Sequence, residues 1–241
     1  PDFLRKLFPY VTIKTSCIRL RTQEIHTKTE GTDMNEEIME QVEEMEKTGK
    51  TSSGTPARPT INSKLRHNIL RMPEVIREAS GIVIYGKRIK SLAFTTDLAI
   101  IKNCDADAVF AVYPFTPQQS ISDAIIKHSS MPVFCGIGGG TTKGLRTVTL
   151  AKDVESQGAI GAVLNAPVSN LNLKMVADSI DIPTVITVVN MDTDIAERIR
   201  YGAAIINVAG GAQTPEIVKM VREAAPGIPI IASGGKTEES I

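Results

Sequence analysis

The chain has 241 residues and a mass of 26.0 kDa, and its 27 basic residues balance its 27 acidic ones. No overall field therefore favours nucleic acid or an anionic membrane as a partner. Aromatic residues make up 4% of the chain and tryptophan is absent, so stacking surfaces for single-stranded nucleic acid are scarce.

Residues 1–60 are predicted to form an N-terminal extension before the main domain. Residues 1–33 are mildly basic and contain one β-like run, YVTIKTSCIRL. In the segment MNEEIMEQVEEMEK, apolar residues recur at helical spacing beneath an acidic face, and the polar linker TGKTSSGTPARPT follows. We expect a leader, a helix and a linker that are poorly ordered in part, and Met34 could be the natural start codon.

From about residue 80, short apolar runs alternate with amphipathic helical segments. Seven runs predict strands that are buried on both faces, at 91–96, 108–114, 132–137, 160–166, 183–189, 204–209 and 229–233. This series of βα units predicts a (β/α)8 TIM barrel over residues 61–241 rather than an open doubly wound sheet, which usually has five or six strands. Before the first strand, GIVIYGKRIKS predicts a hairpin that closes the barrel floor.

The predicted barrel lacks its last βα unit in this sequence. The eighth strand could follow Ile241, be supplied by VTIKTSCIRL as a permuted strand, or come from a partner chain. We favour the first explanation, because the sequence stops inside the helix expected after the seventh strand. An open gap would leave two unpaired strand edges, which a homo-oligomer could cover.

Two glycine pairs follow the last two predicted strands. The stretch PIIASGGKT is not a nucleotide-binding P-loop, because the first glycine of that motif would fall at Ile230. In many barrels, however, the loops after the last two strands bind phosphate through backbone N–H groups and a helix N-terminus. We predict a phosphate site, with simple tight turns as the alternative, at Gly210, Gly211, Ser233, Gly234 and Gly235.

A third glycine-rich stretch, CGIGGGTTKG, follows the third predicted strand. Its glycine spacing does not match the dinucleotide-binding fingerprint. It predicts a backbone-exposed loop at the barrel mouth, where Lys143 could contact a second anionic group, or else simply a mobile loop.

Polar residues at predicted strand ends are candidates for catalysis, because TIM-barrel active sites lie at the carboxyl ends of the strands. Asp97 could act as a general acid or base, or cap the next helix. Asn165 and Asn207 could orient substrate hydroxyl or carbonyl groups, or serve in turns. Lysine is absent from the carboxyl-terminal half of every predicted strand, which argues against a Schiff-base aldolase.

Cysteine usage indicates a reducing compartment. Cys17, Cys104 and Cys135 are odd in number, widely spaced and never in a CxxC pair, which argues against a disulfide scaffold or a zinc site. The N-terminal stretch PDFLRKLFPYV lacks the apolar core of a signal peptide. We therefore expect a cytoplasmic protein without a metal centre.

A family resemblance covers about residues 62–241 and is carried by SKLRHNILR, GKRIKSLAFTTDLAIIKNCDADAVFAVYPFTPQ, PVFCGIGGGTT, GAIGAVLNAP and NVAGGAQTPEIV. These segments resemble an uncharacterised bacterial family of phosphate-binding-type TIM barrels that is loosely labelled "hydrolase". The resemblance implies the barrel fold and an eighth βα unit beyond Ile241, and it implies little chemistry.

The sequence thus predicts an enzyme that acts on a small phosphorylated metabolite at the carboxyl-terminal mouth of a barrel. The reaction could be that of a hydrolase, a lyase or an isomerase. A non-enzymatic barrel that binds a phosphorylated ligand or regulates through it is the alternative. No cofactor is predicted, because a single placed carboxylate, Asp97, is a poor Mg²⁺ site.

Overall fold

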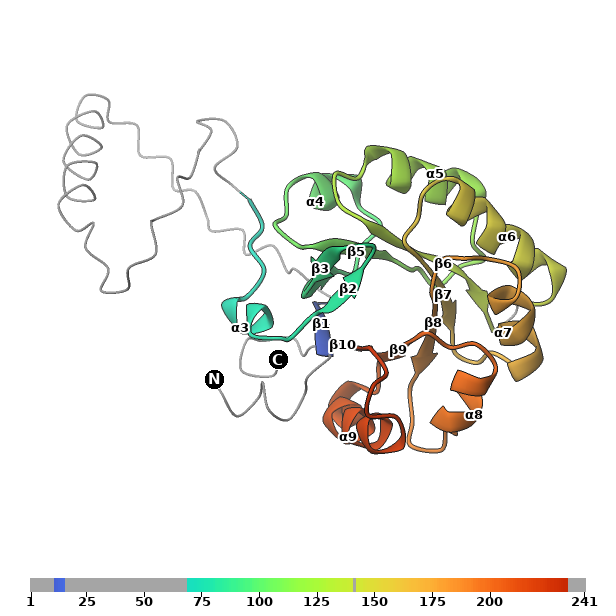
Figure 1. The fold of residues 1–241 in the computed structure, drawn as a ribbon. Helices are drawn as coiled ribbons and strands as arrows, with labels where there is room; N and C mark the ends of the chain where they lie inside the picture. Colours follow the sequence, from blue (N-terminus) through green and yellow to red (C-terminus); the bar gives the residue numbers. More distant parts are fainter. Residues whose placement is uncertain (1–10, 16–68, 141, 234–241) are drawn as a thin grey trace, which may run out of the picture. The chain divides into compact units, whose positions relative to one another are not determined.

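Residues 11–15, 69–140 and 142–233 are described by the structure, which is a computed structural model (Figure 1). All of them belong to one unit of the chain. The predicted helix and linker before residue 61 lie outside the described residues, as do Gly234 and Gly235 of the predicted phosphate site.

Eight parallel strands form a closed barrel in the order β1-β10-β9-β8-β7-β6-β5-β4. The strands are β1 (Val11–Thr15), β4 (Ser91–Ala93), β5 (Ala108–Ala111), β6 (Val133–Gly139), β7 (Gly161–Asn165), β8 (Thr184–Val188), β9 (Ile205–Val208) and β10 (Ile230–Ser233). All seven strands predicted from the apolar runs are present, so the barrel prediction is confirmed.

Helices surround these strands, as Figure 1 shows. They are α4 (Leu98–Lys102), α5 (Gln119–His128), α6 (Leu145–Ser156), α7 (Asn170–Ala177), α8 (Ile195–Arg200) and α9 (Thr214–Ala224), with the shorter α3 (Glu74–Arg77) between β1 and β4 in the chain and the 3-10 turn η1 (Gly211–Gln213) before α9. Within the described ranges, no helix has the length and apolar character needed to cross a membrane.

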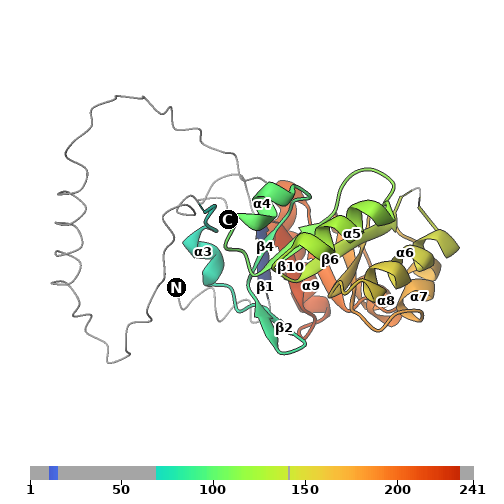
Figure 2. The ribbon, with the colours of Figure 1, turned by 90° about the horizontal axis from the view of Figure 1, so that it is seen from above.

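The place of the eighth strand is taken by β1. Ile13 pairs with Ala232 of β10 on one side and with Ser91 of β4 on the other (Figure 2). Of the three explanations considered, the structure therefore shows the permuted strand. Five residues of the predicted N-terminal extension, Val11–Thr15, thus belong to the barrel. Both strand edges that suggested a homo-oligomer are paired here. Backbone hydrogen bonding joins these strands, and it leaves no local signal in the sequence.

Side chains that alternate along each strand pack into two separate cores, one inside the barrel and one between strands and helices, because successive side chains point to opposite faces of a sheet. Inside the barrel, the Phe110 ring lies 6.1 Å from that of Phe94 and 6.0 Å from that of Phe134. The same interior cluster includes Leu92, Val163, Val185, Ile205 and Ile231. Between strands and helices lies a larger cluster that includes Val109, Cys135, Leu164, Ile186 and Val208. The barrel interior is a packed core, so a ligand has to bind at an end of the barrel.

The predicted floor hairpin is confirmed as β2 (Ile82–Ile84) paired antiparallel with β3 (Lys87–Ile89). Tyr85 and Gly86 both have positive φ, 49° and 78°, as a two-residue type I′ turn requires. Ile82 and Ile89 are buried in the interior cluster. Because the hairpin leads directly into β4, it covers the amino-terminal end of the barrel and leaves the carboxyl-terminal end as the mouth.

Candidate functional site

A cavity of about 310 Å³ opens at the carboxyl ends of β5, β6 and β7. This mouth cavity, as we call it, is lined by Tyr113, Pro114, Phe115, Thr116, Pro117, Gly136, Gly138, Gly139, Gly140, Thr142, Asn165 and Ala166. Its volume lies at the lower end of the range of about 300–1,000 Å³ for small-molecule sites, so a small ligand fits it.

The glycine-rich carboxyl end of β6 and the turn that follows it, here called the glycine loop, form one wall of the mouth cavity, and Gly139 pairs there with Asn165 of β7. Gly138 and Gly139 have φ of 133° and 116°, where side chains are strained. A Cβ atom on Gly139 would collide with the carbonyl oxygen of Asn165, and one on Gly138 would lie 2.9 Å from the Thr142 side chain. Glycine is therefore required here because two pieces of backbone approach closely.

Hydrogen bonds hold both ends of this loop. Gly139 and Thr142 exchange N–H···O bonds of 3.3 and 3.2 Å, and the Gly140 N–H donates to the carbonyl oxygen of Pro167 at 2.7 Å. Further on, the Gly144 N–H donates to Asn172 Oδ1 at 2.8 Å. The described part of the loop is thus anchored, which disfavours the mobile loop considered from the sequence.

Two buried polar side chains hold the loop and were not recognised in the sequence. Asn172 comes from α7, and the Thr147 hydroxyl of α6 donates to the carbonyl oxygen of Thr142 at 3.0 Å. Asn172 lies 28 residues from Gly144 along the chain. No local pattern could have linked them, because only the packing of α7 beside α6 brings them together.

Among the three predicted catalytic residues, the structure brings only Asn165 to the mouth cavity. Its amide has no hydrogen-bond partner among the described residues. Asp97 instead caps α4, where its carboxylate accepts the N–H of Ala99 at 2.7 Å and that of Ile100 at 3.4 Å. Asn207 is 1% exposed, and its Nδ2 donates to Thr187 Oγ1 at 3.0 Å. Asp97 and Asn207 do not line the cavity.

The predicted phosphate corner lies at the same end of the barrel, beyond β8. β9 and β10 are parallel neighbours, so the turn that begins at Gly210 and the end of β10 at Ser233 share one edge. The Gly210 N–H already donates to Thr214 Oγ1 at 3.2 Å, and a Cβ on Gly210 would collide with the side chain of Ile217. Gly210 thus has a packing role, whereas Gly211, with φ of 61°, opens η1 towards the N-terminus of α9.

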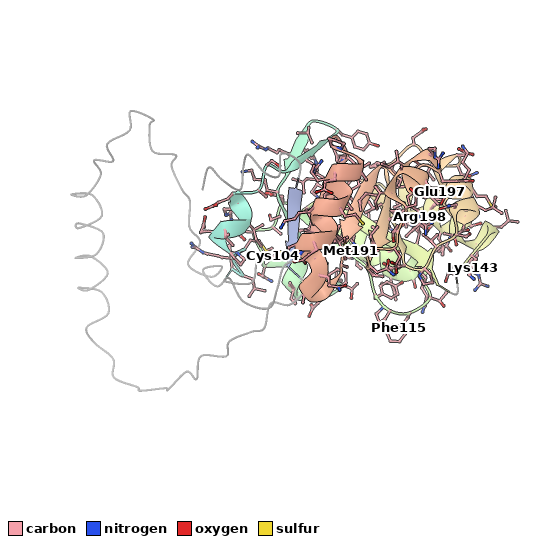
Figure 3. The ribbon with its side chains drawn as sticks, turned by 90° about the horizontal axis from the view of Figure 1, so that it is seen from below. Cys104, Phe115, Lys143, Met191, Glu197 and Arg198 are labelled. Carbon is pink, nitrogen blue, oxygen red and sulfur yellow. The ribbon has the colours of Figure 1, made fainter. Side chains whose placement is uncertain are left out.

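Lys143 is exposed and does not line the mouth cavity. In Figure 3 its side chain points outward at the edge of the molecule, away from the labelled Phe115. The structure therefore does not bring this predicted second anion contact to the cavity.

One lysine does lie in the carboxyl-terminal half of a barrel strand. Lys14 of β1 is in register with Ser233 of β10 and with Leu92 of β4. The prediction that no barrel strand carries a lysine in its carboxyl-terminal half was therefore wrong, because β1 was not counted among the barrel strands. The absence of such a lysine no longer argues against a Schiff-base aldolase. Lys14 is also the strand residue that neighbours the predicted phosphate corner.

The two described cysteines are not suited to nucleophilic chemistry. Burial raises the pKa of the Cys135 thiol from 9.0 to about 12, and burial is also the main cause that raises the pKa of Cys104. The thiolate is the reactive form, so both shifts lower reactivity near neutral pH. Nor does any group of three His, Cys, Asp or Glu side chains within residues 69–140 and 142–233 form a possible metal site.

We expect Cys135 to resist Ellman's reagent in the folded protein at pH 8, when Cys17 is replaced by serine. A thiol with a pKa near 12 holds about a thousandfold less thiolate at that pH than one with a pKa of 9.0. Only one of the two remaining thiols should then react until denaturant is added. Rapid reaction of both thiols in the native state would contradict the burial of Cys135.

Comparison with known proteins gives a likeness of fold. No family model matches the chain, and no curated protein matches it significantly. Among solved structures, dihydrodipicolinate synthase from Bacillus anthracis has a TM-score of 0.45 at 19% identity, over 58% of this chain and 56% of that one. The same enzyme from Agrobacterium tumefaciens has a TM-score of 0.41 at 16% identity, over 56% and 61%.

A phosphonopyruvate hydrolase in complex with oxalate and Mg²⁺ is similar at a TM-score of 0.43 and 15% identity, over 53% of this chain and 60% of that one. The chain thus spans less than two thirds of the length of each of these structures. All three TM-scores lie below 0.5, so the likeness is distant.

Proposed function

We propose that this protein is an enzyme that acts on a small phosphorylated metabolite at the carboxyl-terminal mouth of its barrel. The mouth cavity of about 310 Å³ carries the proposal, because it offers a space of the size of a small ligand beside an anchored glycine loop. It lies where TIM-barrel enzymes bind their substrates. The reaction class, hydrolase, lyase or isomerase, is left to assay.

The phosphate group is proposed to bind at the corner formed by the ends of β9 and β10. Gly211 leads through η1 into the 11-residue helix α9, whose N-terminal dipole favours an anion. Ser233, at the end of β10, offers a hydroxyl group. Lys14 occupies the register position beside Ser233, which adds a cationic residue to the neighbouring strand. Gly210, Gly234 and Gly235 were also predicted from the sequence to bind the phosphate; the Gly210 N–H is bonded to Thr214 Oγ1, and Gly234 and Gly235 lie outside the described residues.

The second candidate is a barrel that binds its ligand without catalysing a reaction. The engagement of Asp97 as the cap of α4 favours it, because a carboxylate that holds two backbone N–H groups is less available as a base. In the enzyme, Asp97 would act on the substrate, Asn165 would orient it, and Asn207 would hold Thr187 in place below the mouth.

Thermal unfolding with a panel of phosphorylated compounds and their dephosphorylated counterparts tests the binding function. A ligand at about 100 times its Kd stabilises the folded state by about 2.7 kcal/mol. For a chain of this size that raises the Tm by roughly 5–10 °C. We expect such a shift with phosphorylated compounds alone. Equal shifts with dephosphorylated counterparts, or none with any compound, would refute the phosphate assignment.

Asp97→Asn separates the enzyme from the binding protein. Asparagine caps helices about as well as aspartate, so the substitution keeps the cap on α4 while it removes the general base. If the protein is an enzyme that uses Asp97 as a base, we expect the variant to keep its Tm and its ligand affinity. Its turnover should fall at least a hundredfold, since general base catalysis contributes about 10²–10⁴-fold. Turnover that survives the substitution would exclude Asp97 from catalysis.

A further inference from the structure

The chemistry of the mouth cavity restricts what can enter it. The twelve lining residues that the structure describes include no Asp, Glu, Lys, Arg or His. A charged group that leaves water for such a space finds no opposite charge, and burying an uncompensated charge is costly. The cavity therefore favours an uncharged part of a ligand, whereas the proposed phosphate corner lies across β8 from it.

Four of the lining residues carry polar side chains, Tyr113, Thr116, Thr142 and Asn165, and two of these have the widest hydrogen-bonding capacity left over. The Asn165 amide can donate two hydrogen bonds and accept others, and it has no partner among the described residues. The Tyr113 hydroxyl accepts the Gln118 N–H at 2.9 Å, which fixes the ring and leaves its own proton to donate. Both groups match hydroxyl and carbonyl oxygens, because these accept the amide and phenol protons and a hydroxyl can also donate to Asn165.

The wall that carries Asn165 is held in a fixed position. Gly139 packs against the Asn165 carbonyl oxygen, and the Gly140 N–H to Pro167 bond of 2.7 Å ties the loop to the segment that follows β7. These contacts fix the backbone from which the Asn165 amide projects, and less ordering of the wall is then required on binding.

We propose that the mouth cavity is the specificity subsite for a neutral, hydroxyl- or carbonyl-bearing end of the phosphorylated ligand, with Asn165 as its specificity-determining residue. This inference rests on the proposed function, since the phosphate group anchors the other end of the ligand. The substrate class that follows is a sugar or polyol phosphate, as opposed to a phosphorylated acid or amine.

Calorimetric titration of the full chain at pH 7 with two size-matched sets of probes tests this. The six-carbon set is glucose 6-phosphate, 6-phosphogluconate and glucosamine 6-phosphate, which differ in the charge far from the phosphate. The three-carbon set is glycerol 3-phosphate and 3-phosphoglycerate, and inorganic phosphate measures the anchor alone. We expect the neutral member of at least one set to bind about tenfold or more tightly than its charged counterparts.

Asn165→Ala is expected to lower the affinity for the neutral probe roughly tenfold and to leave the affinity for inorganic phosphate unchanged. Asn190→Ala is the matched control, because Asn190 follows the neighbouring strand β8 and does not line the cavity. Its affinities should equal those of the unmodified protein. Asn165→Asp should reduce the preference for glucose 6-phosphate over glucosamine 6-phosphate, because the new carboxylate attracts the ammonium group.

The outcomes separate this inference from the function on which it rests. Equal affinities for charged and neutral probes would refute the specificity subsite while phosphate binding stands. The same holds if Asn165→Ala lowers the affinity for inorganic phosphate as much as the affinity for the neutral probes. If neither inorganic phosphate nor any probe binds, the proposed function is refuted, and the subsite with it.

Discussion

Replacing Ile13 with proline is expected to lower the free energy of unfolding by about 3 kcal/mol or more, and the Tm by roughly 6–12 °C. Ile13 is the central residue of β1 and pairs with Ala232 on one side and Ser91 on the other. Proline lacks the N–H that a strand with neighbours on both sides donates to its ladder, and it is therefore confined to sheet edges. Thermal unfolding followed by circular dichroism measures the effect.

Ile13→Val is the control for this experiment, because valine keeps the backbone N–H and a β-branched side chain. It should unfold within a few degrees of the unmodified protein, since Ile→Val substitutions cost about 0.5–1.5 kcal/mol. An Ile13→Pro variant that unfolds at the temperature of the unmodified protein would show that β1 does not close the ring. The eighth strand would then have to come from another segment or from a partner.

Gly139→Ala is expected to cost about 3 kcal/mol of stability and to abolish ligand binding in the mouth cavity. Two effects combine: alanine is strained at φ of 116°, and its Cβ would collide with the carbonyl oxygen of Asn165. The only relief is to move the β6 loop away from β7, which displaces both the glycine wall and Asn165. The Tm should fall by roughly 6–12 °C, and the affinity for phosphorylated probes should fall with it.

Gly140→Ala is the matched control one residue further along. Gly140 also has a positive φ, 59°, but nothing lies within 4 Å of the Cβ that alanine would add. Only the left-handed backbone penalty of about 1–2 kcal/mol applies there. The stability difference between the two variants therefore measures the close approach of β6 to β7, and equal Tm values would contradict that packing.

Much of the fold was predictable because it depends on local patterns. Seven of the eight barrel strands follow from apolar runs such as 160–166, which contains β7 (Gly161–Asn165). The floor hairpin follows from the alternation around Gly86 and a turn whose two residues have positive φ. These features are encoded within about ten residues, where side-chain period and turn chemistry act directly.

The candidate site was predictable only in part. Asn165 could be found because a polar residue at the end of a buried strand points to the barrel mouth. The two roles considered for Asp97, cap and catalyst, cannot be separated in the sequence, since both require an acidic residue before a helix. The structure shows the cap, through bonds to Ala99 and Ile100, and leaves catalysis to the Asp97→Asn experiment.

The sequence by itself determined the class of fold, the order of its βα units and the end of the barrel that forms the mouth, because each depends on periodicity and strand direction. Only the tertiary structure decided that Val11–Thr15 closes the ring and that Lys14 stands beside Ser233. It also decided that the glycine loop meets Asn165 beside a cavity whose described lining residues carry no charged side chain. Those features join residues far apart in the chain, and contacts at such separations are set by packing and strand register, which no local pattern records.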